Sequence, residues 1–154
     1  IMIASCQYVK DLIGKLFKKP EYLTLKYNIN DTGYSVSNSN NNIFNFIGSR
    51  NGFDTNMTMS GNYVLLKKGI TYHIFISLLS NTNNVSYRLQ TNTGTIFGTR
   101  GFMSLNNYSP TPIDMIYTPI SDMYVGCIAQ ANMSAFYPHC SSVVIYEIPN
   151  RILR

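Results

Sequence analysis

The 154-residue sequence has little charge, no tryptophan and no long hydrophobic run. Charged residues make up 12% of it, about half of the roughly 25% typical of soluble domains. The longest apolar-rich run, residues 70–79, is interrupted by polar side chains and is far too short for a membrane-spanning helix, so we expect no membrane span. Apolar residues still reach 45%, which is enough to fill a core and excludes an intrinsically disordered chain.

Neutral polar residues take the place of charge. The chain has 18 Asn, 15 Ser and 12 Thr, together 45 of its 154 residues. Such side chains suit turns, exposed strand faces and crowded assemblies better than the surface of a free enzyme that charge keeps in solution.

The net charge of +5 is concentrated at the two ends of the chain. Residues 1–20 carry four lysines against one aspartate, residues 21–149 balance at zero, and the tail adds Arg151 and Arg154. Binding to a nucleic-acid duplex needs several Lys or Arg on one face, and the body offers only Lys67 beside Lys68. We therefore expect no nucleic-acid partner and divide the chain into an N-terminal segment (1–20), a body (21–149) and a basic C-terminal tail (150–154).

The three cysteines form an odd set without metal-binding spacing. We favour buried free thiols in a protein assembled inside the cell. The alternative is that Cys127 and Cys140 meet on adjacent strands. His139 beside Cys140 suggests a metal, but a zinc site needs about four ligands and only His73 is left to help. The sequence predicts no metal and no cofactor.

The motifs of common catalytic sites are missing as well. The seven Asp and Glu are dispersed, and neither His73 nor His139 has an acidic neighbour in the sequence. A phosphate-binding loop, a Gly-x-Ser-x-Gly nucleophile elbow and a His-Glu-x-x-His zinc motif are all absent. We therefore expect a protein that is not an enzyme and has no catalytic residues.

Residues 3–19 have the periodicity of an amphipathic helix. Apolar side chains recur at three- and four-residue steps and form one stripe: Cys6, Val9, Leu12, Ile13, Leu16 and Phe17. Lysines occupy the other faces, and Pro20 ends the helix. Three partners for the stripe stay open. The helix packs on its own domain or on symmetry mates, it docks into a larger assembly, or it lies on a membrane surface.

After Pro20 the apolar period changes to two, which indicates strands. The expected strands are 22–28, 34–37, 43–48, 53–59, 63–66, 70–79, 85–91, 95–98, 113–120, 123–131 and 142–148. Turn signals such as Asn51-Gly52 separate them, and no second helix is expected. The sequence therefore predicts an all-β, antiparallel jelly roll or β-sandwich preceded by one short N-terminal amphipathic helix.

Two of these strands have no fully polar face. One side of residues 70–79 carries Tyr72, Ile74 and Ile76, and the other side is mixed; residues 123–131, with Tyr124 and Ile128, are apolar or small on both sides. We expect each strand to lie between two layers, one being the core and the other a neighbouring subunit. The 12 tyrosines suit such an interface, because rings pack there while hydroxyls stay hydrogen-bonded.

Several stretches resemble the C1q/TNF-like jelly-roll heads of phage and viral fibre proteins. Gly69 and Tyr72 form an x-x-Gly-x-x-Tyr pattern within residues 61–74, between a short strand and a long one. Residues 85–89, 94–98 and 142–148 are similar to later strands of such modules. The resemblance covers residues 55–148 and implies a homotrimer packed around a three-fold axis, in a virion protein that is assembled in the host cytoplasm.

Polar loops are the candidate contact sites. The sequence around Arg50 echoes that around Arg100, which indicates either a recurrent turn or two equivalent loops at one end of the sandwich. The loops 37–42, 81–84 and 106–112 are long, polar and adaptable. The contact residues that we select are Asn40, Asn83, Asn107 and Tyr108, together with Arg50 and Arg100.

Three functions are compatible with these features. The favoured one is a structural or attachment module of a bacteriophage or viral particle. Its N-terminal helix docks to other virion proteins, and its trimeric head presents polar loops to a host receptor or glycan. The second is a lectin, in which Tyr rings stack on sugars and Asn side chains bond hydroxyls. The third is a minor capsid jelly roll that binds no receptor.

Overall fold

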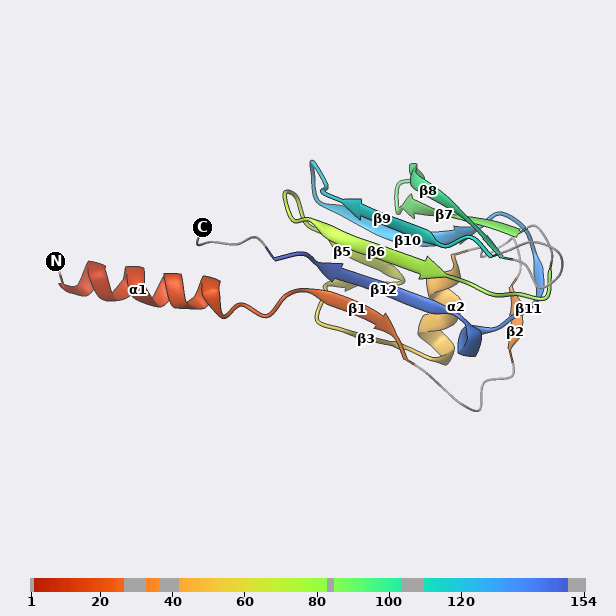
Figure 1. Ribbon diagram of the computed structural model, residues 1–154, viewed down its shortest axis with the longest axis horizontal. Helices are drawn as coiled ribbons and strands as arrows, with labels where there is room; N and C mark the ends of the chain where they lie inside the picture. Colours follow the sequence, from red (N-terminus) through yellow and green to blue (C-terminus); the bar gives the residue numbers. More distant parts are fainter. Residues whose placement is uncertain (1, 27–32, 37–41, 83–84, 104–109, 150–154) are drawn as a thin grey trace.

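The computed structural model describes residues 2–26, 33–36, 42–82, 85–103 and 110–149. Two five-stranded antiparallel sheets pack face to face (Figure 1). One sheet, here called the β12 sheet, has the order β3 (Phe53–Thr55), β1 (Tyr22–Leu25), β12 (Ser142–Glu147), β6 (Tyr72–Ser77) and β9 (Ile113–Tyr117). The other, the β10 sheet, has the order β4 (Met59–Ser60), β5 (Tyr63–Leu66), β10 (Met123–Ala129), β7 (Val85–Thr91) and β8 (Ile96–Met103). The predicted all-β sandwich is confirmed.

The pairing of the eight principal strands is that of a jelly roll. The first pairs with the last (β1 with β12), the second with the seventh (β5 with β10), the third with the sixth (β6 with β9) and the fourth with the fifth (β7 with β8). Folding this ladder of antiparallel pairs over itself produces two sheets joined by Greek-key connections. Strands that are distant in sequence thereby become neighbours at the centre of each sheet.

The core lies between the sheets and follows the period-two pattern of the sequence. Strand β6 buries alternate residues, with Tyr72, Ile74 and Ile76 inaccessible to solvent. Tyr87 on β7 reaches across from the opposite sheet, and its hydroxyl donates to the Ile76 carbonyl at 2.9 Å while accepting from Leu78 N–H at 3.3 Å. A buried tyrosine needs a partner for its hydroxyl, and this one finds it on the other layer.

The prediction of a strand over residues 43–48 is wrong. Residues Ile43–Arg50 form a second helix, α2, whose N-cap Asn42 accepts a hydrogen bond from Phe44 N–H at 3.1 Å. Gly52 follows it with φ +75, and its N–H bonds the Ile47 carbonyl, as in a glycine-terminated helix end. Asn51-Gly52 therefore closes a helix rather than a hairpin.

Helix α2 closes one side of the sandwich. Its N-cap Asn42 bridges to Ile128 on β10, and Phe44 packs edge-on against Phe53 of β3 with ring centroids 5.4 Å apart. Ile43, Phe44 and Ile47 have no exposed surface and belong to the main core. The helix thus contacts both sheets from the side.

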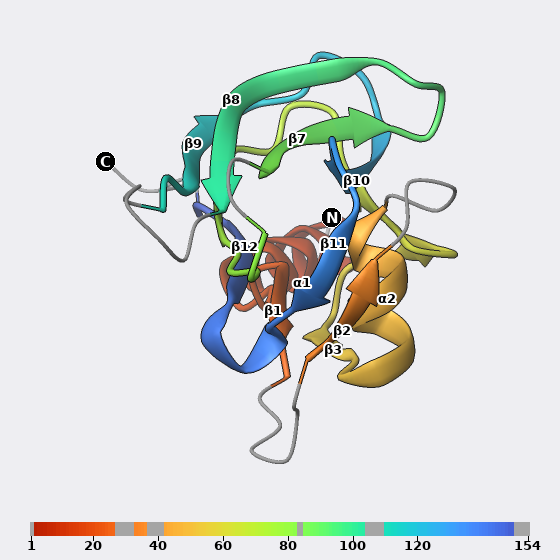
Figure 2. The same cartoon turned by 90° about the vertical axis from the view of Figure 1, so that its right-hand side faces the viewer.

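Several strand boundaries also differ from the predicted ones. The expected strand 53–59 is split into β3 and β4, and β8 extends to Met103. A small third sheet, which the sequence did not indicate, pairs β2 (Tyr34–Val36) with β11 (Met133–Phe136), and the 3-10 helix η2 (Pro138–Cys140) follows it. This sheet closes the end of the sandwich that faces the viewer in Figure 2.

Helix α1 (Met2–Leu16) confirms the predicted N-terminal helix. It does not lie on the sandwich: Figure 1 shows it projecting from the end of the molecule at which β1 begins. Of the alternatives for the stripe, packing on its own domain is therefore not found in the single chain, and most of the stripe is exposed. No described helix is long and apolar enough to cross a membrane.

Candidate assembly surface

The outward face of the β12 sheet is the broadest candidate surface. The strand register aligns Tyr22, Tyr146, His73 and Ile116 in one row across β1, β12, β6 and β9. The neighbouring row contains Asp54, Thr24, Val144, Phe75 and Asp114. Among these outward-facing residues, the only carboxylates stand on the edge strands β3 and β9, so the centre of the face is apolar, aromatic and hydroxyl-bearing. Ile116 is 67% exposed and Tyr146 is 42% exposed.

A hydrogen-bonded chain of side chains fixes the middle of this face. His73 Nε2 lies 2.6 Å from Asp114 Oδ1, and His73 Nδ1 lies 2.9 Å from the Tyr146 hydroxyl. With Nε2–H donating to the carboxylate, Nδ1 of the neutral ring accepts from Tyr146. The two rings also meet edge-on at 5.2 Å between centroids. These contacts restrain the two rings on the outward side of the sheet, which reduces the entropy they lose on contact with a partner.

The same face is recessed at its other end. A cavity of about 400 Å³ is lined by Thr24 and Val144 of the sheet and by His139 and Cys140 of η2. The face therefore has exposed aromatic side chains and a recess, and such a surface can pack against one of complementary shape.

A buried polar network holds the point where the N-terminal segment enters the sandwich. Glu21 is 5% exposed, and its carboxylate receives the Tyr72 hydroxyl at 2.8 Å and forms an ion pair with Lys67. Glu21 N–H donates to the Glu147 carboxylate at 3.0 Å. Burial raises the pKa of Tyr72, and the hydrogen bond to Glu21 raises the pKa of Lys67. Each charge here has a hydrogen-bond or ion-pair partner, as a buried charge requires, and the network fixes the start of β1.

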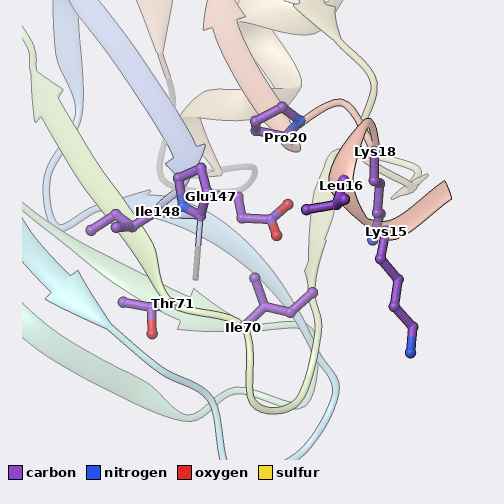
Figure 3. Close-up of a pocket in the computed structure, with 9 residues that line it drawn as sticks. Lys15, Leu16, Lys18, Pro20, Ile70, Thr71, Glu147 and Ile148 are labelled. Carbon is purple, nitrogen blue, oxygen red and sulfur yellow. The ribbon is translucent and has the colours of Figure 1, made fainter. Parts of the chain in front are cut away.

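A second cavity lies between α1 and the sandwich. It has a volume of about 300 Å³. The end of α1 and the segment after it line one side, and residues just before β6 and at the end of β12 line the other: Lys15, Leu16, Lys18, Pro20, Ile70, Thr71, Glu147, Ile148 and Pro149. Figure 3 shows Leu16 directed toward the Glu147 carboxylate, while the Lys15 ammonium points away from it. Leu16, in the last turn of α1, borders this cavity and is 45% exposed.

The predicted docking residues are mostly exposed. The exposed fractions are 50% for Val9, 48% for Ile13, 45% for Leu16 and 81% for Phe17, and Leu12 is partly buried. Each of these side chains except Phe17 lies on α1, and Phe17 follows its last residue. The stripe is thus present as an unpartnered apolar surface in the single chain.

The sequence predicts five residues on strands between the core and a neighbouring subunit, three of them on β6 and two on β10. Tyr72, Ile74 and Ile76 are in the core, so the outward side of β6 consists of the residues between them. Tyr124 is half-buried, and Ile128, which forms an isolated β-bridge with Asn42, is 7% exposed. Ile128 is therefore already buried in the single chain, without a neighbouring subunit.

The predicted contact loops lie only partly within the described residues. Asn40, Asn83, Asn107 and Tyr108 lie outside the described residues. Neither arginine of the sequence echo is on a loop: Arg50 is the last residue of α2, and Arg100 lies within β8, its guanidinium 6.0 Å from the Phe102 ring centroid. The two segments are not equivalent loops.

The cysteines are free, and Cys127 does not pair with Cys140. Cys127 is fully buried on β10, and burial raises its pKa, whereas Cys6 and Cys140 are exposed. The expectation of buried thiols therefore holds for Cys127 and is wrong for the other two. Among the described residues, no three His, Cys, Asp or Glu side chains gather into a metal-binding group.

Comparisons with known proteins add no relative. No protein-family model matches the chain, and no curated protein matches it significantly.

Proposed function

We propose that this protein is a non-enzymatic structural and attachment module of a bacteriophage or viral particle. In this proposal three copies form a head through the outward faces of their β12 sheets, and residues 1–20 hold the head on the particle. The module is assembled in the host cytoplasm, and the finished head presents polar loops to a host receptor or glycan.

The β12 sheet carries the proposal. Its outward face bears Tyr146, Phe75 and Ile116 at positions where an isolated antiparallel sheet normally places polar residues. The described central strands β1, β12 and β6 place no Lys, Arg, Asp or Glu on that face. Depletion of charge with enrichment of aromatic residues is the composition of an interface core. The choice of a trimer over other symmetric assemblies comes from the resemblance in residues 55–148.

The size of the protein in solution tests the head. We expect sedimentation equilibrium to give the mass of three 17.4 kDa chains. Ile116→Asp places a charge on the apolar face proposed as the interface, so this variant should sediment as a folded monomer with an unchanged far-ultraviolet circular dichroism spectrum. The matched control is Ile120→Asp, because Ile120 is 89% exposed but lies beyond the end of β9. A monomeric parent chain, or a trimer indifferent to Ile116→Asp, would refute the interface.

Incorporation into particles tests the attachment end. Deletion of residues 1–16 removes α1 and leaves the polar network around Glu21 in place. We expect the truncated chain to fold and to be missing from purified particles that contain the full chain. Normal incorporation of the truncated chain would show that the N-terminal segment does not attach the head.

A further inference from the structure

Helix α1 is a short helix whose apolar side chains have no partner in the single chain. It has 15 residues, and its Val9, Ile13 and Leu16 are each close to half exposed. Isolated helices shorter than about 12–15 residues are marginal in water, and most helical stability in proteins comes from packing of the apolar face. A partner for α1 is therefore needed for the helix to persist as the chain folds.

The spacing of the apolar residues specifies what kind of partner fits. We define the α1 stripe as Cys6, Val9, Ile13 and Leu16. The steps between them are three, four and three residues, which is the alternation of the a and d positions of a heptad. A heptad seam is complementary to another seam of the same kind, and the apolar residues Leu12 and Phe17 flank the seam at g and e and widen the contact. The spacing favours helix-on-helix packing.

The charges of α1 are compatible with identical helices lying side by side in parallel. With Cys6 and Ile13 at a, the lysines fall at positions outside the a/d seam. In a parallel pair, each g residue meets the e residue five positions further along the other helix. That relation brings Leu12 against Phe17, two apolar side chains, and it pairs no lysine with another lysine. Like charges therefore do not oppose the parallel arrangement.

The position of α1 in the fold supplies the same geometry. Five residues separate its end at Leu16 from the start of β1, and the Glu21 network fixes that start. Strand β1 belongs to the β12 sheet, and α1 projects beyond it at one end of the sandwich (Figure 1). Copies that meet through their β12 sheets around one axis would place their α1 helices at the same end and pointing the same way.

We propose that α1 packs in parallel against the α1 helices of other copies of this chain, with the α1 stripe as the shared core. The inference rests on the proposed function for the number of copies, which the head sets at three, and for the common direction of their helices. The lysines stay on the outside of the bundle, where they form the basic surface by which the segment contacts the particle. Cys6 of each copy lies near Cys6 of its neighbours in an a layer.

Oxidation of the full chain tests this arrangement through Cys6. Thiols whose Cα atoms approach within about 7 Å form a disulfide without backbone movement. We expect mild oxidation of dilute protein to give dimers linked between Cys6 and Cys6, identified by mass spectrometry of the peptides. Cys6→Ser should abolish the link, and Cys140→Ser, which removes the exposed thiol of the head, should leave it unchanged.

A charged substitution in the α1 stripe is the second test of the packing. Ile13→Asp should slow Cys6 linkage by roughly tenfold or more, because the charge is buried against other copies. The matched control is Lys18→Asp, an exposed position outside the stripe, which should link at the rate of the parent chain. Dimers linked through Cys140, or Cys6 linkage that is indifferent to Ile13→Asp, would overturn the bundle.

The outcomes separate this inference from the proposed head. A trimer that depends on Ile116 but shows no Cys6 linkage overturns the bundle and leaves the head intact. Cys6 linkage in a protein whose mass is indifferent to Ile116→Asp supports the bundle and overturns the head interface. A strictly monomeric chain without linkage overturns both. Loss of the Cys6 linkage when vesicles of anionic lipid are added would assign the stripe to a membrane surface and also overturn the bundle.

Discussion

The buried hydroxyl of Tyr87 joins the two sheets of this sandwich. The Tyr87 hydroxyl lies against the backbone of β6 and also 3.1 Å from the Thr111 carbonyl, so one side chain from the β10 sheet serves two segments on the other side. Its ring leaves no room at Gly101, where an added Cβ would approach the ring carbon Cζ to 2.2 Å. Gly101 is therefore required by close approach and not by an unusual backbone conformation.

Removal of the Tyr87 hydroxyl should destabilise the fold. Tyr87→Phe leaves the ring in place but deprives the buried Leu78 N–H of its partner. We expect the free energy of unfolding to fall by about 1–3 kcal/mol, the usual cost of a buried polar group left unsatisfied. Urea denaturation measures this change. Tyr63→Phe, on a half-buried ring outside this network, serves as the control, and an equal loss in both variants would contradict the assigned role.

Buried ionisable groups make the fold sensitive to high pH. Burial raises the pKa of Cys127 above its ordinary 9.0, and burial also raises the pKa values of Tyr72 and Tyr87. A raised pKa in the folded state contributes stability that is complete below the unfolded-state pKa and is lost as the pH rises toward the folded-state pKa. We therefore expect the free energy of unfolding to decline above about pH 9.

Denaturation at a series of pH values checks this decline. Cys127→Ala removes one of the three groups, so the slope above pH 9 should be shallower than in the parent chain. A free energy of unfolding that is constant from pH 7 into the alkaline range would contradict the assignment of these groups as buried and protonated.

At the scale of elements, α2 shows how a local pattern misleads. Residues 43–48 alternate in a way that also fits a strand, but Ile43, Phe44 and Ile47 are spaced for one side of a helix. The cap Asn42 and the terminating Gly52 were visible in the sequence as helix signals. The same residue types also mark the turns between strands of this chain, so these signals alone do not distinguish a helix from a hairpin.

The cap of α2 gives a prediction at this scale. Asn42→Ala removes the acceptor for Phe44 N–H, and we expect a loss of about 1 kcal/mol in the free energy of unfolding. Asn92→Ala, in an exposed turn, is the control and should change it by less than about 0.5 kcal/mol. Chemical denaturation distinguishes the two, and equal effects would argue against a capping role for Asn42.

The similar segments around Gly48 and Gly98 have different secondary structures. Gly98 has φ +75, and the β7–β8 register shifts at this point, so the strand contains a bulge. Arg88 donates to the Gly98 carbonyl at 2.9 Å from the neighbouring strand. The similar residues around Gly48 lie in a helix, so the same short sequence has two structures because its tertiary surroundings differ.

At the scale of the whole molecule, the chain consists of a projecting helix and a closed sandwich joined by a short exposed linker. Trypsin should cleave between Lys18 and Lys19, because both are exposed in the segment between α1 and Pro20. We expect a stable fragment that begins at Lys19, detected by mass spectrometry after brief digestion. Replacement of both lysines by glutamine should suppress this cut, and cleavage after Arg88 in β7 or Arg100 in β8 at an equal rate would contradict a resistant head.

Periodicity in the sequence determined the all-β class, the helix before Pro20 and the buried side of β6, because burial imposes a period on each element locally. Only the tertiary structure decided which strands pair, where α2 lies and which sheet face remains apolar and open. Those features depend on contacts between residues far apart in the chain, such as Tyr146 with His73 and Asn42 with Ile128. The scarcity of charge in the sequence also became interpretable only in the structure, because folding places uncharged side chains together on the outward face of the β12 sheet.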